Sequence, residues 1–443
     1  MWVFCRSRRV AGVIAIAALA LAGCGSSGAK TTGTTTGPTA TTGTSGTSGT
    51  TAPASTNTAS APGVTATTVT VGLITSLTGP ASPEYTGIIP GAQARIDQQN
   101  AAGGVDGRQI KLATADDTSS PGGAATAAAV LVSKNVFAMI GESPFIFGGA
   151  QYLQKHGLPV VGGGYDGPEW GTQPYTNMFA LMPVDPHYPV NSGAALFIKQ
   201  QGGDVTSAFG YGESPSSTAA AKGYMLAAKN VGMKAGYLNT SIPFGSVATG
   251  PIALAMKGAN VDSTYLPMDN NTNFALVTAA KQAGVNLKVA VSATGYGQSL
   301  LDDSAAVQAA DGSYFLSLAA PVELNNAATK NFQSALAQYA HFTGVPGFDY
   351  QQGWLSADLM IKGLEVAGQN PTRTSFESGL HGVTSYDAGG LLPSPLNFSL
   401  SLFGQLPQTQ CSYYLQLKGT TFVPVPADGK PFCGQLLPNS NQL

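Results

Sequence analysis

Histidine, the side chain most often used for acid–base catalysis and metal binding, is scarce in this sequence. The chain has 443 residues and 4 His, which are scattered and lack the HExxH spacing of a zinc site. No GxSxG turn, Walker loop or CxxC pair occurs either. A hydrolase needs a nucleophile and a base within reach of each other, and the sequence offers no such set. We therefore predict a protein that is not an enzyme and that has no cofactor and no metal.

Two local patterns resemble binding motifs, and each has a simpler interpretation. Residues 162–167 match GxGxxG after an expected strand, but Pro168 stands where a phosphate-binding helix should begin. The strand is also not the first of its unit, so a dinucleotide site is the minor alternative. Asp116 and Asp117 are able to bind a hard cation, but without a third carboxylate at loop spacing a surface turn is favoured.

Aromatic residues recur just after the ends of expected strands. In open α/β sheets this edge holds the ligand, so these side chains are candidates for a pocket wall. Simple packing explains them equally well. The residues are Tyr85, Tyr165, Trp170, Tyr211 and Tyr296.

Charge is low and unevenly distributed. Charged residues make up 10% of the chain, against roughly 25% in an average soluble protein, and the net charge is -2. This balance argues against a nucleic-acid binder, which needs a basic excess. No charge occurs between Lys30 and Glu84, and every acidic residue lies from Glu84 onward. The chain therefore divides into an uncharged N-terminal stretch behind a basic start and a mildly acidic folded region.

The first residues resemble a bacterial lipoprotein signal. Arg6, Arg8 and Arg9 precede an apolar run over 10–22, which is too short to span a bilayer. Leu21-Ala22-Gly23-Cys24 resembles a lipobox, which implies cleavage after residue 23 and lipidation of Cys24. An ordinary secretory signal is the alternative. The resemblance places the protein at the cell membrane, lipid-anchored on its extracytoplasmic face, because two or more acyl chains anchor stably.

Residues 24–66 are nearly all Thr, Gly, Ser, Ala and Pro, which predicts a disordered tether because there is little to bury. Beyond the signal and Cys24, the remaining cysteines are Cys411 and Cys433. Two thiols in an exported domain predict a disulfide. A metal site is the weaker alternative, since one Cys pair supplies too few ligands.

From residue 68 the sequence alternates strand and helix patterns. Strands with intervening helices predict doubly wound parallel sheets, and the number of elements is enough for two α/β lobes. The expected strands are 69–74, 109–113, 136–140, 158–161, 205–209, 234–238, 263–266, 287–291 and 314–318. The expected helices include 123–133, 147–156, 188–201, 218–231, 246–256, 272–283, 326–340 and 350–367.

Several strings resemble the Leu/Ile/Val-binding family, the type I solute-binding proteins of ABC importers. They are Val71-Gly72-Leu73-Ile74, Leu77-Thr78-Gly79-Pro80, the run from Asn100 to Arg108 (NAAGGVDGR) and Asp116-Asp117. The resemblance implies two lobes joined by three crossings, with hinge points near Pro183, Ser313 and Ala388. It assigns residues 67–184 and 314–388 to the N-terminal lobe, and residues 185–313 and 389–443 to the C-terminal lobe. It further implies a monomer that works with ABC permease subunits.

The same resemblance implies ligand contacts from both lobes. In the first lobe these are Tyr85, Glu142, Ser143, Gly164, Tyr165 and Asp166, and in the second they are Ser216, Asp269 and Thr294. The second lobe departs from the family pattern, because the acid expected for the ligand ammonium is missing. Asp166 stands where a hydroxyl residue is usual. An α-amino acid ligand is therefore in question.

The functional hypothesis is a receptor that captures a small polar molecule, an amino acid or a related amide or acid, and delivers it to an ABC importer. Closure is expected to be a hinge motion of the two lobes. A sensor of the same fold without transport is the alternative, and an exported hydrolase is a weaker one.

Overall fold

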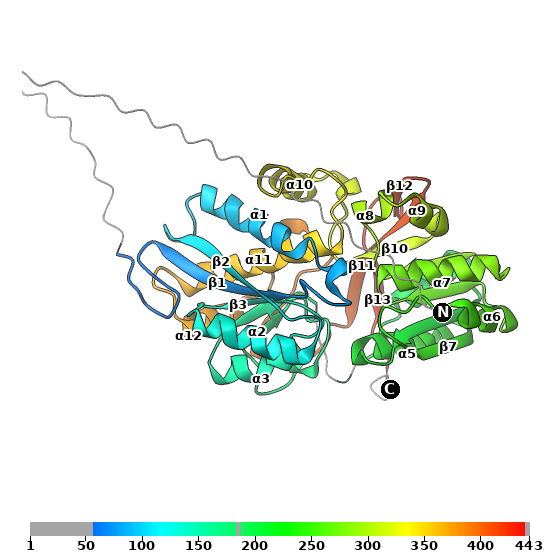
Figure 1. The fold of residues 1–443 in the computed structure, drawn as a ribbon, viewed down its shortest axis with the longest axis horizontal. Coiled ribbons are helices and arrows are strands. Elements are labelled where there is room, and N and C mark those ends of the chain that lie inside the picture. Colours follow the sequence, from blue (N-terminus) through cyan, green and yellow to red (C-terminus); the bar gives the residue numbers. More distant parts are fainter. Residues whose placement is uncertain (1–55, 183–186, 188, 439–443) are drawn as a thin grey trace, which may run out of the picture. The chain divides into compact units, whose positions relative to one another are not determined.

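A computed structural model describes residues 56–182, 187 and 189–438 (Figure 1). The predicted signal peptide, the lipidation site at Cys24 and the predicted tether up to residue 55 lie outside the described residues. Within the described part of the chain, no helix has the length and apolar character needed to cross a membrane.

The first sheet is parallel throughout and forms the centre of the first lobe. Its strand order is β2-β1-β3-β4-β5. Strand β2 lies on one side of β1, and β3, β4 and β5 follow in turn on the other side, as in a doubly wound sheet. Val69, Val71 and Ile74 of β1 are buried because both faces of the sheet are covered by helices. The strands are β1 (Thr68–Thr75), β2 (Gln109–Asp116), β3 (Met139–Glu142), β4 (Val160–Gly162) and β5 (Met178–Ala180).

Helices pack against both faces of this sheet and form two apolar cores. One core is shared by α1 (Ile88–Ala101), α10 (Ala327–Tyr339), α11 (Phe348–Ala367) and α12 (Arg373–His381). The other is shared by α2 (Pro121–Ser133) and α3 (Phe147–Lys155). Figure 1 shows α1 and α11 on the side of the sheet opposite α2 and α3.

The second sheet combines parallel and antiparallel strands. Its order is β12-β11-β10-β9-β8-β6-β7, with β13 paired to β11. The strands from β6 to β10 are parallel, whereas β11 runs antiparallel to β10 and β12. The bounds are β6 (Val205–Tyr211), β7 (Lys234–Ile242), β8 (Ser263–Leu266), β9 (Val289–Ser292), β10 (Tyr314–Ser317), β11 (Thr409–Lys418), β12 (Thr421–Val425) and β13 (Phe432–Gln435).

The helices of the second lobe also cover two faces. One core contains α4 (Gly193–Gln200) and α5 (Pro215–Asn230), and another contains α6 (Gly250–Gly258) and α7 (Asn270–Gln282). Two short helices, α8 (Gln298–Leu301) and α9 (Ser304–Ala310), border a third small core. Local sequence fixes the starts of α5 and α7, because the Ser214 and Asp269 side chains accept hydrogen bonds from the backbone N–H groups of Ser217 and Thr272.

This architecture confirms the predicted α/β fold with two lobes. The antiparallel strands β11 to β13 were not predicted, because their sequence is interrupted by proline and resembles loop. They pair Cys411 with Cys433, and the predicted disulfide joins these two residues.

Two of the expected lobe boundaries differ from those in the structure. Strand β10 was assigned to the first lobe, but it pairs with β9 and β11 in the second sheet, so the second crossing follows Ser317. Residues after 388 were assigned to the second lobe, but Leu391 and Leu392 are buried in the first-lobe core. The third crossing therefore lies just before β11, about 20 residues beyond the expected point.

The end of the expected tether is also different. Residues 57–66 were predicted to be disordered, yet Asn57 donates a 2.8 Å hydrogen bond to the Asp106 carbonyl and Val64 is buried at the first core. Val64 also forms a bridge with Val69 beside β1. Residues 57–66 are too small and polar to form a core of their own. They are ordered here because they pack on the surface of the first lobe.

Arg108 secures this N-terminal segment. Its side chain is 1% exposed, and its guanidinium donates hydrogen bonds to the carbonyl groups of Thr65 (2.7 Å) and Thr58 (3.0 Å). It also donates to the carbonyl of Gln369 and the side chain of Asn370, beyond the end of α11. One buried cation thus joins the N-terminal segment to the first lobe.

We predict that Arg108→Met destabilises the folded chain by about 3 kcal/mol, because buried carbonyl groups lose charge-assisted hydrogen bonds. Chemical denaturation measures this change. Lys111→Met is the matched control, since it removes the same charge from an exposed position on β2. An equal loss of stability in both variants would contradict the assignment.

Candidate ligand-binding site

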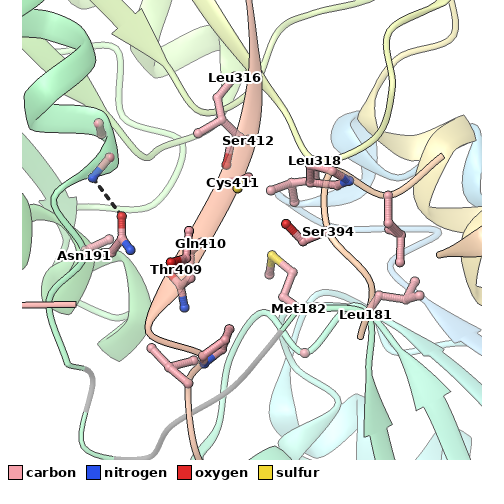
Figure 2. Close-up of a pocket in the computed structure, with 18 of the residues that line it drawn as sticks. Leu181, Met182, Asn191, Leu316, Leu318, Ser394, Thr409, Gln410, Cys411 and Ser412 are labelled. Atoms are coloured by element: carbon pink, nitrogen blue, oxygen red, sulfur yellow. Dashed lines mark hydrogen bonds between the residues drawn. The ribbon is translucent and has the colours of Figure 1, made fainter. Parts of the chain in front are cut away.

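A cavity of about 430 Å³ lies between the lobes, where the chain crosses from one to the other. Residues of all three crossings line it: Met182 and Pro189 in the first, Leu318 in the second, and Leu406 in the third. Figure 2 shows residues Thr409 to Ser412 of β11 running along one wall, opposite Leu181 and Met182. We call this space the hinge cavity.

The walls of the hinge cavity are mainly apolar, and both lobes contribute. The first lobe supplies Leu355 of α11, and the second supplies Ala220 and Tyr224 of α5. Sequence patterns did not identify these positions, because a helix face that lines a cavity has the same apolar spacing as one that packs on a core. The crossing segments carry no motif at all.

The loop after β4 belongs both to this cavity and to the contact between the lobes. Gly164 has φ +71°, a conformation that favours glycine, and it turns the chain so that Tyr165 lines the cavity. Asp166 reaches the second lobe, where it accepts hydrogen bonds from the Ser214 hydroxyl (3.0 Å) and the backbone N–H of Ser216 (3.1 Å). Burial raises the pKa of Asp166. The carboxylate therefore lies at the N-terminus of α5, where a negative charge is stabilised.

A second carboxylate makes the same kind of contact. Glu84, in the loop after β1, accepts a 2.8 Å hydrogen bond from the backbone N–H of Asn270 at the start of α7. Burial raises its pKa to about 7, and the nearby charges of Asp269 and Asp349 act in the same direction. Sequence analysis missed Glu84, because a single glutamate in a loop carries no spacing signal.

Glu142 lies behind the tyrosine that lines the cavity. It is fully buried at the end of β3 and accepts hydrogen bonds from the hydroxyl groups of Tyr165 and Ser356. Burial raises the pKa of Glu142 to about 8, since desolvation of the charge outweighs these two hydrogen bonds. Glu142 therefore holds the Tyr165 ring in place and is mostly uncharged at neutral pH.

Tyr85 and Ser143 are positioned within the first lobe. Tyr85 packs edge-on against Tyr165 and Phe348, with ring centres 6.5 and 6.2 Å apart. Ser143 is buried, donates to Asp117 and accepts a 2.9 Å hydrogen bond from the backbone N–H of Phe145. Neither residue lines the hinge cavity.

Asp269 and Thr294 are likewise engaged within the second lobe. Asp269 caps α7 and accepts a hydrogen bond from the Tyr211 hydroxyl. Thr294 donates a 2.7 Å hydrogen bond to the carbonyl of Met268.

The structure therefore brings together part of the predicted set. Gly164, Tyr165 and Ser216 line the hinge cavity, and Glu142 and Asp166 contact these residues directly. A role in ligand binding stays a prediction for all nine residues.

The two motif-like patterns have structural explanations. After residues 162–167 the chain forms a short 3-10 helix (Pro168–Gly171) and not the long helix of a dinucleotide site. Asp116 accepts hydrogen bonds from the loop at Leu77 and Thr78, but Asp117 is buried, so the expected surface turn is only half correct. Among the described residues, no three His, Cys, Asp or Glu side chains are grouped as metal ligands.

A sequence model of periplasmic binding proteins matches residues 68–421. The chain belongs to this family. The match covers both lobes and confirms the resemblance to Leu/Ile/Val-binding proteins that the sequence motifs indicated. A comparison with curated proteins finds no significant match.

Solved structures of the family share the fold. A fatty acid ABC transporter substrate-binding protein from Thermomonospora curvata is 20% identical with a TM-score of 0.69, covering 86% of this chain and 95% of its own. A branched-chain amino acid transporter substrate-binding protein from Streptococcus pneumoniae, in complex with isoleucine, is 18% identical with a TM-score of 0.63, covering 80% and 97%. A solute-binding protein from R. palustris, in complex with benzoate, is 17% identical with a TM-score of 0.66, covering 84% and 98%.

We predict that the stability of the chain falls as pH rises from 5.5 to 8.5, in part through Glu142. Its folded pKa of about 8 is above its ordinary value of 4.5, so its stabilising contribution is complete below pH 4.5 and is lost as pH rises through 8. The expected loss is on the order of 3 kcal/mol.

Glu142→Gln reduces this pH dependence, whereas the exposed control Glu213→Gln leaves it unchanged. Thermal unfolding at several pH values gives the comparison. An unchanged slope in Glu142→Gln would show that Glu142 is charged in the folded chain.

Proposed function

We propose that this chain is the lipid-anchored, extracytoplasmic receptor of an ABC importer and that it binds a small organic solute in the hinge cavity. The observation that supports this proposal is that both lobes and all three crossings line a single cavity. A ligand in such a place contacts every segment that moves when the lobes rotate, so its binding energy favours one interlobe angle. The importer then recognises the liganded arrangement.

The relatives support the transport part of the proposal. Of the three solved structures described above, one is named as a fatty acid ABC transporter substrate-binding protein. The other two are ABC transporter solute-binding proteins, one in complex with isoleucine and one in complex with benzoate. Because their ligands differ this widely on one fold, the fold is compatible with an amino acid, an amide or an acid here. The side chains of the hinge cavity decide among them.

The proposal includes the absence of catalysis. In the described wall of the hinge cavity, hydroxyl-bearing residues such as Ser216 and Ser394 have no histidine beside them to act as a general base. The polar groups there are suited to hydrogen bonding. A sensor without transport has the same cavity. Finding an ABC permease gene beside the gene for this chain would favour transport over sensing.

We predict that a binding solute raises the melting temperature and that Ala220→Trp abolishes this increase, because the indole fills the hinge cavity. At one hundred times the dissociation constant the gain is about 2.7 kcal/mol. A thermal-shift screen over amino acids, amides, ureas and aromatic acids measures it. Ala305→Trp, on an exposed position of α9, is the control and keeps the increase.

An equal increase in both variants would place the ligand elsewhere. Chemical turnover of the bound compound by the purified chain would contradict a receptor without catalysis.

We predict that Cys24→Ser moves the protein from the membrane fraction to the soluble fraction, because it removes the site of lipidation. Cys5→Ser is the matched control: it removes a cysteine of the signal that the lipobox does not use, and the protein stays in the membrane fraction. Fractionation followed by detection of the folded domain gives the result. Membrane association that persists in Cys24→Ser would reject the lipobox.

A further inference from the structure

A second cavity adjoins the hinge cavity. It has a volume of about 180 Å³, and we call it the side cavity. The two cavities share five wall residues: Met182, Pro395, Leu396, Leu406 and Pro407. Figure 2 shows the Met182 side chain pointing into the hinge cavity near Ser394. Methionine is unbranched and flexible, so a shift of Met182 joins the two spaces into one elongated cavity.

The side cavity has aromatic walls. Trp170, Phe179, Phe398 and Phe403 line it. His381 also lies there, with its ring nitrogens 2.8 Å from the Phe398 carbonyl oxygen and 3.0 Å from that of Thr176. The histidine is thus engaged by the backbone and not directed to a ligand. A wall of this kind accommodates an apolar segment.

The described wall of the hinge cavity contains no Asp, Glu, Lys, Arg or His. A charged group placed there has no counter-ion within the described wall, and burying an unpaired charge is costly. Two helix N-termini at the contact between the lobes are already in use, since Asp166 occupies the start of α5 and Glu84 the start of α7. The cavity therefore favours a ligand without charge.

Two polar groups in the hinge cavity lack partners within the described chain. Gln352 of α11 is 1% exposed, and no hydrogen bond reaches its side-chain oxygen. Asn191 uses its oxygen to accept from the N–H of Gly193 (2.7 Å), while its side-chain nitrogen has no partner. A buried polar group without a partner costs free energy, so a ligand that both donates and accepts is favoured. A hydroxyl or a carboxamide meets this requirement.

We propose that the ligand is an uncharged, elongated amphiphile, with a hydroxyl or carboxamide group at Gln352 and an apolar chain that passes Met182 into the side cavity. This inference rests on the proposed function, because it names the ligand class of the hinge cavity. The indole N–H of Trp170 also lacks a described partner. An ester carbonyl at the far end of the ligand's apolar chain accepts a hydrogen bond from this N–H, whereas a plain alkyl chain leaves the N–H without a partner.

The test measures binding of 1-butanol, 1-hexanol, 1-octanol and 1-decanol by calorimetry, with octanoate, decanoate and leucine as charged comparisons. The chain carries Cys24→Ser, so that no detergent competes with the probes. Each methylene that enters the cavity is expected to increase affinity about fourfold. The alcohols are expected to bind about tenfold or more tightly than carboxylates of the same length.

Two substitutions separate the cavities. Ser399→Trp fills the side cavity and is expected to remove the gain from hexanol to decanol while butanol binds as before. Gln405→Trp, at an exposed position of the same wall, is a second variant with the same expectation. Gln352→Leu is expected to weaken every alcohol about tenfold without changing the gain per methylene.

The outcomes distinguish this inference from the proposed function. If carboxylates bind as tightly as alcohols, or if the length dependence persists in both side-cavity variants, the ligand class is wrong. If leucine or an aromatic acid binds in an Ala220→Trp-sensitive manner and no alcohol does, the receptor function stands and the amphiphile is excluded. If Ala220→Trp has no effect on any ligand, the hinge cavity itself is not the site.

Discussion

Each lobe buries its own apolar core, and this separation determines how the rest of the molecule works. The first-lobe cores are built around β1 and the helices on its sheet, and the second-lobe cores around β6 to β10. The relation between the lobes then depends on three crossings and on smaller contacts, such as those made by Asp166 and Glu84. Aromatic packing also joins the lobes, since the rings of Phe145 and Phe244 lie with their centres 6.5 Å apart. Interfaces between domains of one chain commonly permit relative motion. A cavity at the crossings is therefore well placed to link ligand binding to the interlobe angle.

Two of the contacts between the lobes are made by buried carboxyl groups. Asp166 and Glu84 accept hydrogen bonds from the second lobe, and neither takes part in the ion pairs of the described chain. Burial raises the pKa of both groups. The hydrogen bonds that these groups accept from the second lobe act in the opposite direction, since each of them lowers the pKa of its carboxyl group.

Much of the fold was predictable because its signals are local. A strand buried on both faces is a short β-branched run, as in β1, and amphipathic helices such as α10 show their spacing directly. The antiparallel strands β11 to β13 were not predictable in this way. Pro424 lies within β12, and prolines at 407, 426 and 431 flank the three strands. The extended segments are held by pairing with β11 and by the disulfide.

The residues of the candidate site also divide into those with a local sequence signal and those without one. Loop residues such as Gly164 and Tyr165 were found, because they follow a strand end and match a family motif. The crossing residues were not, since Met182, Leu318 and Leu406 come together only through tertiary structure. Residues 57–66 show the reverse error: their composition predicts disorder, and the contact with Arg108 overrides it.

Asp166 occupies the position where the family resemblance implies a hydroxyl residue. The N-terminus of a helix such as α5 is able to bind a carboxylate. Here Asp166 takes that place from within the chain and accepts two hydrogen bonds at the start of α5. A ligand carboxylate at this place would approach a buried acid of the same sign, which is unfavourable. For the uncharged ligand proposed above, the missing second-lobe acid and the added first-lobe acid have one common explanation: such a ligand carries neither of the two charges of an amino acid.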